Sequence, residues 1–238
     1  MTAIFAGIFT LLGVGTVTPY IILRIKKKLM PAIFLKIGAS MLFLLTTGVS
    51  VLSAGPVVWE RWKYLFLGAI IGQVFSLLGD FWLDMKDMMP AHQTAYTFAG
   101  FSSFIIGHLF FIAGLLRTYG IGAQTLLFVA GAGLLMCAIV LGTEGLMKLK
   151  YGKFKAITAV YGAVFGMSLA ASMFSFLYAG RNPQALVMNL GLVVFLLSDL
   201  VLSGTYFGEN RQRPVDYILN YVFYFGGQFT IALSLLWV

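Results

Sequence analysis

Eight long apolar stretches, separated by short polar connections, occupy most of the 238-residue chain. Each is about twenty residues or longer, which is the length an α-helix needs to cross the hydrocarbon core of a bilayer. Lipid offers a backbone no hydrogen-bond partner, so stretches of this kind cross it as helices. The pattern predicts an all-α, polytopic membrane protein with eight transmembrane helices, at residues 3–23, 31–53, 62–83, 94–117, 121–146, 155–179, 184–206 and 216–237.

The connections between these stretches are too short to hold a soluble domain. Charged residues make up only 10% of the chain and hydrophobic residues 60%, whereas soluble domains carry about 25% charged residues. We therefore expect residues 1–238 to form a single transmembrane helical domain. The first apolar stretch has neither a basic leader nor a small-residue cleavage site, which favours a retained helix over a signal peptide.

The net charge of +8 comes from 16 basic residues that are scattered through the short connections. This distribution is typical of residues that orient a membrane protein and does not indicate a nucleic-acid partner. The connections after the first, third, fifth and seventh helices carry 11 of the 16, while the N-terminus and the other connections carry 4. The bias predicts that both termini are non-cytoplasmic. We expect a bacterial inner membrane, with a eukaryotic internal membrane as the alternative.

Two segments half a chain apart resemble each other. Residues 77–83 (LLGDFWL) match residues 196–202 (LLSDLVL) at an offset of 119, and the same offset places Lys36 on Lys155. A repeat of this kind predicts two parallel four-helix halves with a site between them. Few positions match, so a chance likeness is the competing interpretation.

Asp80 and Asp199 are the acids that lie deepest within predicted helices. A charge at that depth costs about 2.5–3.5 kcal/mol on insertion scales, so each calls for a reason. Both should lie one or two turns below the cytoplasmic surface. Either they form a functional site or they are a structural, hydrogen-bonded pair. Asp84 and Asp87 follow on the same face but are expected at the membrane boundary, as ordinary solvated acids.

Further polar residues share helix faces with these two acids and should line an inner cavity that opens toward the cytoplasmic leaflet. They are Lys36, Ser76, His108, Tyr161, Asn220, Tyr224 and Gln228. Some have a simpler interpretation: Lys36 could extend to the headgroups, and His108 could be a structural polar residue. The small residues Gly68-xxx-Gly72 and Gly162-xxx-Gly166 indicate close helix contacts.

The residue inventory excludes several hydrolase classes. A membrane metal hydrolase would need about three histidines around its ion, and the chain has two. No G-x-S-x-G sequence is present for a serine hydrolase. The remaining chemistry uses two carboxyl groups, of which one is protonated and one ionised, as general acid and base. Such a site needs no metal or organic cofactor.

Five short pieces, in order along most of the chain, carry a resemblance. They are Pro31-Ala32-Ile33-Phe34-Leu35-Lys36, Ser76-Leu77-Leu78-Gly79-Asp80, Phe104-Ile105-Ile106-Gly107-His108, Phe195-Leu196-Leu197-Ser198-Asp199 and Tyr224-Phe225-Gly226-Gly227-Gln228. Together they resemble the YhhN-like lysoplasmalogenase family of integral membrane alkenyl ether hydrolases. Departures from the family pattern fall at Ile37, Phe111 and Gly227, whereas both aspartates are intact.

The resemblance implies hydrolysis of the vinyl ether bond of a lysoplasmalogen, or a related lysophospholipid drawn from the bilayer, to a fatty aldehyde and a glycerophospho-base. Asp80 and Asp199 would be the general acid and base, in an order that the sequence leaves open. Four residues would bind the headgroup phosphate or position water: Lys36, His108, Tyr224 and Gln228.

Two other functions fit the same residues. In a proton-coupled transporter or lipid flippase, the two aspartates would form a proton relay and the repeat would support alternating access. A non-catalytic scaffold would explain the small-residue faces but not the buried acids. The headgroup and chain-length preference and the oligomeric state are left open by the sequence.

Overall fold

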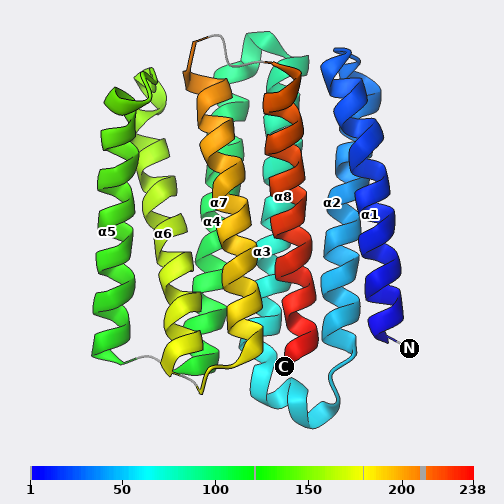
Figure 1. The fold of residues 1–238 in the computed structure, drawn as a ribbon, viewed down its shortest axis with the longest axis vertical. Coiled ribbons are helices and arrows are strands. Elements are labelled where there is room, and N and C mark those ends of the chain that lie inside the picture. The colour runs from blue at the N-terminus through cyan, green and yellow to red at the C-terminus, as the bar shows by residue number, and fades with distance from the viewer. Residues whose placement is uncertain (1, 121, 179, 210–212) are drawn as a thin grey trace.

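The computed structural model describes residues 2–120, 122–178, 180–209 and 213–238. Over these ranges the chain forms eight α-helices and three short 3₁₀ turns, arranged as an up-and-down bundle with both termini at one end (Figure 1). The elements are α1 (Thr2–Ile25), α2 (Leu29–Leu52), α3 (Pro56–Met88), η1 (Pro90–His92), α4 (Gln93–Tyr119), α5 (Ala123–Leu146), η2 (Gly152–Phe154), α6 (Lys155–Tyr178), α7 (Pro183–Phe207), α8 (Pro214–Ser234) and η3 (Leu235–Trp237).

Each of the eight described helices is long and apolar enough to cross a membrane. The prediction of an all-α, multi-pass membrane protein is confirmed, and most predicted bounds are within a few residues. The predicted helix ends at 121 and 179 lie outside the described residues. The predicted helix 62–83 is wrong at both ends, because α3 begins at Pro56 and continues to Met88. Its charged final turns stay helical because their carboxylates find cationic partners inside the bundle.

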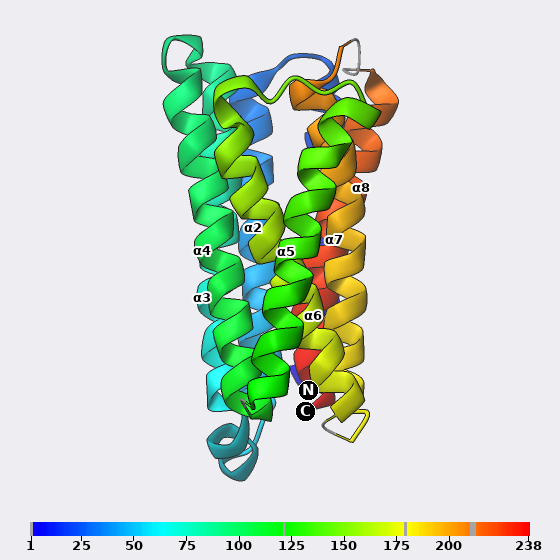
Figure 2. The same cartoon turned by 90° about the vertical axis from the view of Figure 1, so that its left-hand side faces the viewer.

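Helices that follow each other in sequence pack as hairpins: α1 with α2, α3 with α4, α5 with α6, and α7 with α8. Further contacts join the hairpins into one bundle, chiefly α4 with α6, α2 with α3, α6 with α7, and α8 with α2 and α1. Helix α5 lies at the edge, packed against α6 (Figure 2). Its outer leucines are largely exposed (Leu127 74%, Leu134 73%), as suits a face that contacts lipid.

Glycines let the paired helices approach at backbone distance. A Cβ on Gly72 would lie 2.9 Å from the carbonyl oxygen of Gly107, and one on Gly107 would lie 2.8 Å from that of Gly72. The α7–α8 hairpin repeats this reciprocal contact with Gly191 and Gly227, at 3.0 and 2.8 Å. Only glycine fits such contacts.

The other predicted close-contact glycines also lie against neighbouring helices. A Cβ on Gly68 would lie 2.6 Å from the carbonyl oxygen of Phe110 in α4. On α6, Gly162 and Gly166 face Val140 and Met136 of α5 at 2.5 and 2.6 Å. The interpretation of both small-residue motifs as packing faces is confirmed.

These glycine contacts support the half-chain repeat in the way that the helices pack, but the polar side chains of the two halves do not correspond. Gly72 and Gly191 are 119 residues apart, the offset found in the sequence, and the α2–α8 contact maps onto the α6–α4 contact. The proposed equivalence of Lys36 and Lys155 is wrong. Lys36 is buried, whereas Lys155 begins α6 and forms a more exposed ion pair with Glu144. The two halves therefore share a scaffold and differ in their polar side chains.

We predict that replacing Gly72 by alanine lowers the free energy of unfolding by about 1–3 kcal/mol, the usual cost of an overpacked core. The added methyl would meet the Phe111 ring at 2.5 Å. The matched control is Gly48→Ala in α2, where a Cβ meets nothing within 4 Å and alanine favours the helix. Thermal melting of the purified proteins measures both, and equal melting temperatures would contradict the packing role.

The charge bias predicts that both termini lie outside the cytoplasm. Epitope tags at the two ends should both be accessible to antibody in intact spheroplasts, because N and C lie at the same end of the bundle (Figure 1). Accessibility only after the membrane is opened would reverse the orientation.

Candidate functional site

Lys36 lies between two carboxylates in the interior of the bundle. Its Nζ is 3.3 Å from Asp80 Oδ1 and 3.2 Å from Asp84 Oδ1, and the residue is only 4% exposed. Asp84 also accepts a hydrogen bond from the Tyr20 hydroxyl at 3.4 Å. Asp84 follows Asp80 by one turn of α3 and so faces α2 on the same side. The interpretations of Lys36 as a headgroup-seeking lysine and of Asp84 as a solvated acid are both wrong.

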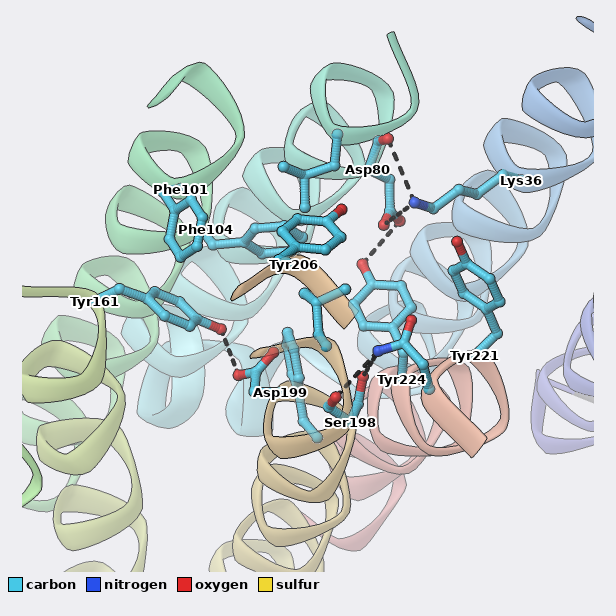
Figure 3. A pocket seen from close by; sticks show the side chains of 14 residues that line it. Lys36, Asp80, Phe101, Phe104, Tyr161, Ser198, Asp199, Tyr206, Tyr221 and Tyr224 are labelled. Atoms are coloured by element: carbon cyan, nitrogen blue, oxygen red, sulfur yellow. Dashed lines mark hydrogen bonds and ion pairs between the residues drawn. The ribbon is translucent and has the colours of Figure 1, made fainter. Parts of the chain in front are cut away.

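Asp80 of α3 is held by side chains from two other helices, α2 and α8. Its carboxylate forms an ion pair with Lys36 of α2, and its Oδ2 accepts a hydrogen bond from Tyr224 OH of α8 at 2.8 Å (Figure 3). The same oxygen accepts a hydrogen bond from Ser40 Oγ of α2 at 2.5 Å. The carboxylate thus has both a counter-charge and hydroxyl donors. A buried anion with this set of partners is stabilised and held in one orientation.

Asp199 has a different environment. It lies on α7, where its Oδ2 accepts a hydrogen bond from Tyr161 OH of α6 at 2.7 Å (Figure 3). Within the described part of the chain, no cationic side chain forms an ion pair with Asp199. Asp80 and Asp199 are bonded to separate partners, so the alternative of a structural pair that they form with each other is wrong.

Both aspartates line one cavity of about 40 Å³, which is room for a few water molecules. Its wall is partly aromatic and partly polar, and Figure 3 shows the labelled side chains around it. The lining residues are Lys36, Asp80, Leu83, Phe101, Phe104, Tyr161, Phe195, Ser198, Asp199, Leu202, Tyr206, Asn220, Tyr221 and Tyr224. We call this space the acid cavity.

A second cavity of about 90 Å³ adjoins the acid cavity and shares with it Asp199, Tyr161 and Phe101. The rest of its wall is mainly apolar and comes from α5, α6 and α7. Ile139 of α5 and Leu200 of α7 line it and are also 46% and 45% exposed. This apolar cavity therefore reaches the outer surface of the bundle, where lipid chains would lie.

A third cavity of about 270 Å³ adjoins the acid cavity on another side and shares with it Tyr206, Asn220 and Tyr221. Its wall carries charged groups from α1, α3, α8 and the α1–α2 connection. We call it the polar vestibule. The acid cavity thus lies between a polar space and an apolar one.

Six of the nine predicted site residues line the acid cavity: Lys36, Asp80, Tyr161, Asp199, Asn220 and Tyr224. Asn220 donates through Nδ2 to the backbone oxygen and to Oγ of Ser198, both at 3.0 Å. The structure therefore brings together, at one place, side chains from α2, α3, α6, α7 and α8.

Ser76, His108 and Gln228 do not line it. Ser76 donates to the Gly72 carbonyl at 3.1 Å, and Gln228 accepts from the side chain of Gln73 through its backbone oxygen at 3.1 Å. His108 Nδ1 is 3.1 Å from Ser168 Oγ, and its ring packs among phenylalanines and Tyr161. His108 and Gln228 bond to neighbouring helices, whereas Ser76 bonds within α3. The prediction that these three residues line the cavity is therefore not supported by their positions.

Sequence reasoning missed several residues around Asp80 and Asp199. Ser40 lies one turn after Lys36, so helical spacing could have found it. Spacing places Asp84 on the face of Asp80, but the sequence predicts it in solvent rather than in contact with Lys36. Ser198, Tyr206 and Tyr221 line the cavity from α7 and α8. Their positions depend on how those helices are rotated, which spacing within one helix does not reveal.

A family model, that of the YhhN family, matches residues 32–235. The chain belongs to the YhhN family. The YhhN match includes Lys36, both cavity aspartates and Tyr224. Searches of curated proteins and of solved structures gave no significant match.

We predict that Lys36→Met lowers the free energy of unfolding by about 3–5 kcal/mol, since it leaves two buried carboxylates without their counter-charge. Adding Asp84→Asn should restore part of the loss by removing one of the two charges. Thermal melting in detergent measures both variants. The matched control is Lys63→Met, whose exposed ion pair with Glu60 (2.8 Å) should matter little. Equal losses at the two lysines would contradict the buried triad.

Proposed function

We propose that this YhhN-family protein is a membrane-embedded hydrolase that cleaves the vinyl ether bond of a lysoplasmalogen to a fatty aldehyde and a glycerophospho-base. The observation that supports it most is the order of the three spaces. A polar vestibule, a cavity with two carboxyl groups and an apolar cavity open to the outer surface follow one another. A single-chain ether lipid has the same order of headgroup, vinyl ether and alkyl chain.

The two carboxyl groups are assigned different roles because their partners differ. Lys36 compensates a negative charge on Asp80, but no comparable group compensates one on Asp199 among the described residues. Uncompensated charge is costly away from water. We therefore assign the proton to Asp199, as general acid, and the negative charge to Asp80.

The reaction begins at the vinyl carbon that carries the alkyl chain. Asp199 gives its proton to the carbon farther from the ether oxygen, and the adjacent carbon becomes an oxocarbenium ion. Asp80 faces the same cavity as an anion and stabilises that positive charge. A water molecule attacks the cationic carbon and gives a proton to Asp80, which leaves a hemiacetal.

Collapse of the hemiacetal returns the carboxyl groups of Asp80 and Asp199 to their starting protonation states. Asp80 returns its proton to the departing glycerol oxygen, while the hemiacetal hydroxyl gives its proton to Asp199 as the aldehyde forms. The net change adds one water across the vinyl ether. Tyr161 and Lys36 act here as positioning residues, since each holds one of the two carboxyl groups.

The packing below the acid cavity favours a hydrolase over the transporter alternative. About two turns deeper on α3 (~10 Å by helical rise), Gln73 accepts a hydrogen bond from Thr47 and donates to the backbone oxygen of Gln228. All three residues are fully buried. They join α2, α3 and α8, so a path to the opposite face would have to break this cluster.

Purified protein in detergent should release aldehyde from a lysoplasmalogen. Asp199→Asn and Asp80→Asn should each lower kcat by about 10²–10⁴-fold, the range for loss of a general acid or base. Tyr161→Phe should lower it less, because the carboxyl group remains. Aldehyde is measured with a coupled dehydrogenase.

The matched control is Glu209→Gln, an exposed carboxylate paired with Lys150 at the same end of the bundle, which should keep wild-type turnover. No release by the wild type would refute the proposed activity, and full release by either aspartate variant would refute its role. Proton-coupled flux in proteoliposomes that requires Asp80 and Asp199 would instead support a transporter.

A further inference from the structure

The polar vestibule carries more cationic than anionic side chains. Arg24, Lys27 and Lys86 line it together with Asp87 and Asp216. Asp216 has a counter-charge of its own, because Arg213 binds it through Nη2 at 2.9 Å. The vestibule wall therefore has a positive excess even before a ligand enters.

Of the two buried cations in this wall, Arg24 and Lys86, Lys86 is the less well satisfied by its neighbours. Its side chain is 9% exposed, and its nearest carboxylate oxygen, Asp87 Oδ1, is 3.8 Å away, beyond hydrogen-bond distance. Asp87 is bonded instead to the guanidinium of Arg24. The Lys86 ammonium lies 3.3 Å from the centre of the Tyr206 ring. A nearly buried ammonium with only an aromatic face at close range is a site for an anion.

Lys36, the lysine predicted to bind phosphate, is unsuited to that role. It is committed to Asp80 and Asp84 at 3.3 and 3.2 Å. Lys86 has no such commitment, and Tyr206, against which it stacks, lines all three spaces. An anion held at Lys86 would thus be next to the acid cavity rather than inside it.

We propose that the polar vestibule binds the phosphate of a lysophospholipid headgroup, with Lys86 and Arg24 as its main ligands and Lys27 at the entrance. This inference rests on the proposed function, whose substrate class it specifies. The phosphate lies in the vestibule, the glycerol passes Tyr206 and Asn220, and the chain extends past Asp199 into the apolar cavity. The site should prefer single-chain lipids with a phosphate over neutral ones.

Native mass spectrometry of the intact protein in detergent tests this without any cleavage. The probes are an acyl lysophosphatidylethanolamine, which lacks the vinyl ether, a monoacylglycerol of the same chain length, and glycerol 3-phosphate. Lys86→Gln should weaken lysophospholipid binding about tenfold, as expected for loss of one charge-assisted contact. It should leave monoacylglycerol binding unchanged, and Lys86→Arg should bind as the wild type does.

Lys27→Gln and Lys28→Gln form a matched pair, because both lysines are exposed in the same connection and only Lys27 lines the vestibule. Lys27→Gln should weaken lysophospholipid binding, whereas Lys28→Gln should not. If Lys86→Gln melts at a lower temperature than the wild type, its weaker binding could come from lost stability. The comparison of Lys27→Gln with Lys28→Gln then tests the headgroup site. Equal effects of the two would overturn the proposal.

Three other results would also overturn it. Lys86→Gln could bind the lysophospholipid as tightly as the wild type does, or it could lose as much affinity for monoacylglycerol as for the lysophospholipid. Glycerol 3-phosphate could bind as tightly as the lipid, which would indicate a site for free phosphate esters. Failure of the proposed activity is distinguishable. Asp199→Asn should bind the lysophospholipid as the wild type does. If lysophospholipid binding depends on Lys86 but the protein releases no aldehyde, the headgroup site is supported and the proposed hydrolase activity is refuted.

Discussion

The contact on which the rest of this site depends is the ammonium of Lys36 between the carboxylates of Asp80 and Asp84. Three charges lie buried in the interior of the bundle, so each is tolerable only in the presence of the others. The cluster fixes α2 against α3, and the hydrogen bond from Tyr224 to Asp80 adds α8. One wall of the acid cavity is therefore determined by electrostatics rather than by apolar packing.

The opposite wall is built differently although its scaffold is similar. The α3–α4 and α7–α8 hairpins close through equivalent glycine contacts, at Gly72 and Gly191. Yet Asp80 has a lysine, a serine and a tyrosine around it, while Asp199 has the Tyr161 hydroxyl. A duplicated framework thus presents two carboxyl groups in unlike surroundings, which is the condition for one to act as acid and the other as base.

The three cavities also determine in which direction an amphiphile would lie past Asp80 and Asp199. Leu202 and Tyr206 line all three, so the vestibule, the acid cavity and the apolar cavity adjoin one another at these two side chains. Cationic groups are placed at one end of this series and an opening toward lipid at the other. An amphiphile can lie along it only one way round, because its charged end is excluded from the apolar cavity by the cost of desolvation.

The sequence by itself determined the eight apolar helices, the two deep aspartates and the small-residue contact faces, because apolar length, buried charge and helical spacing are local properties. It placed Asp84 in water, which is wrong. It also offered His108 either as a site residue or as a structural one, and in the structure His108 contacts Ser168 and does not line the acid cavity. Whether a polar residue is solvated, paired or enclosed depends on the helices opposite it: Lys36 faces Asp84, and Ser168 faces His108. Only the tertiary structure decides that, because the partners come from helices far apart in the chain.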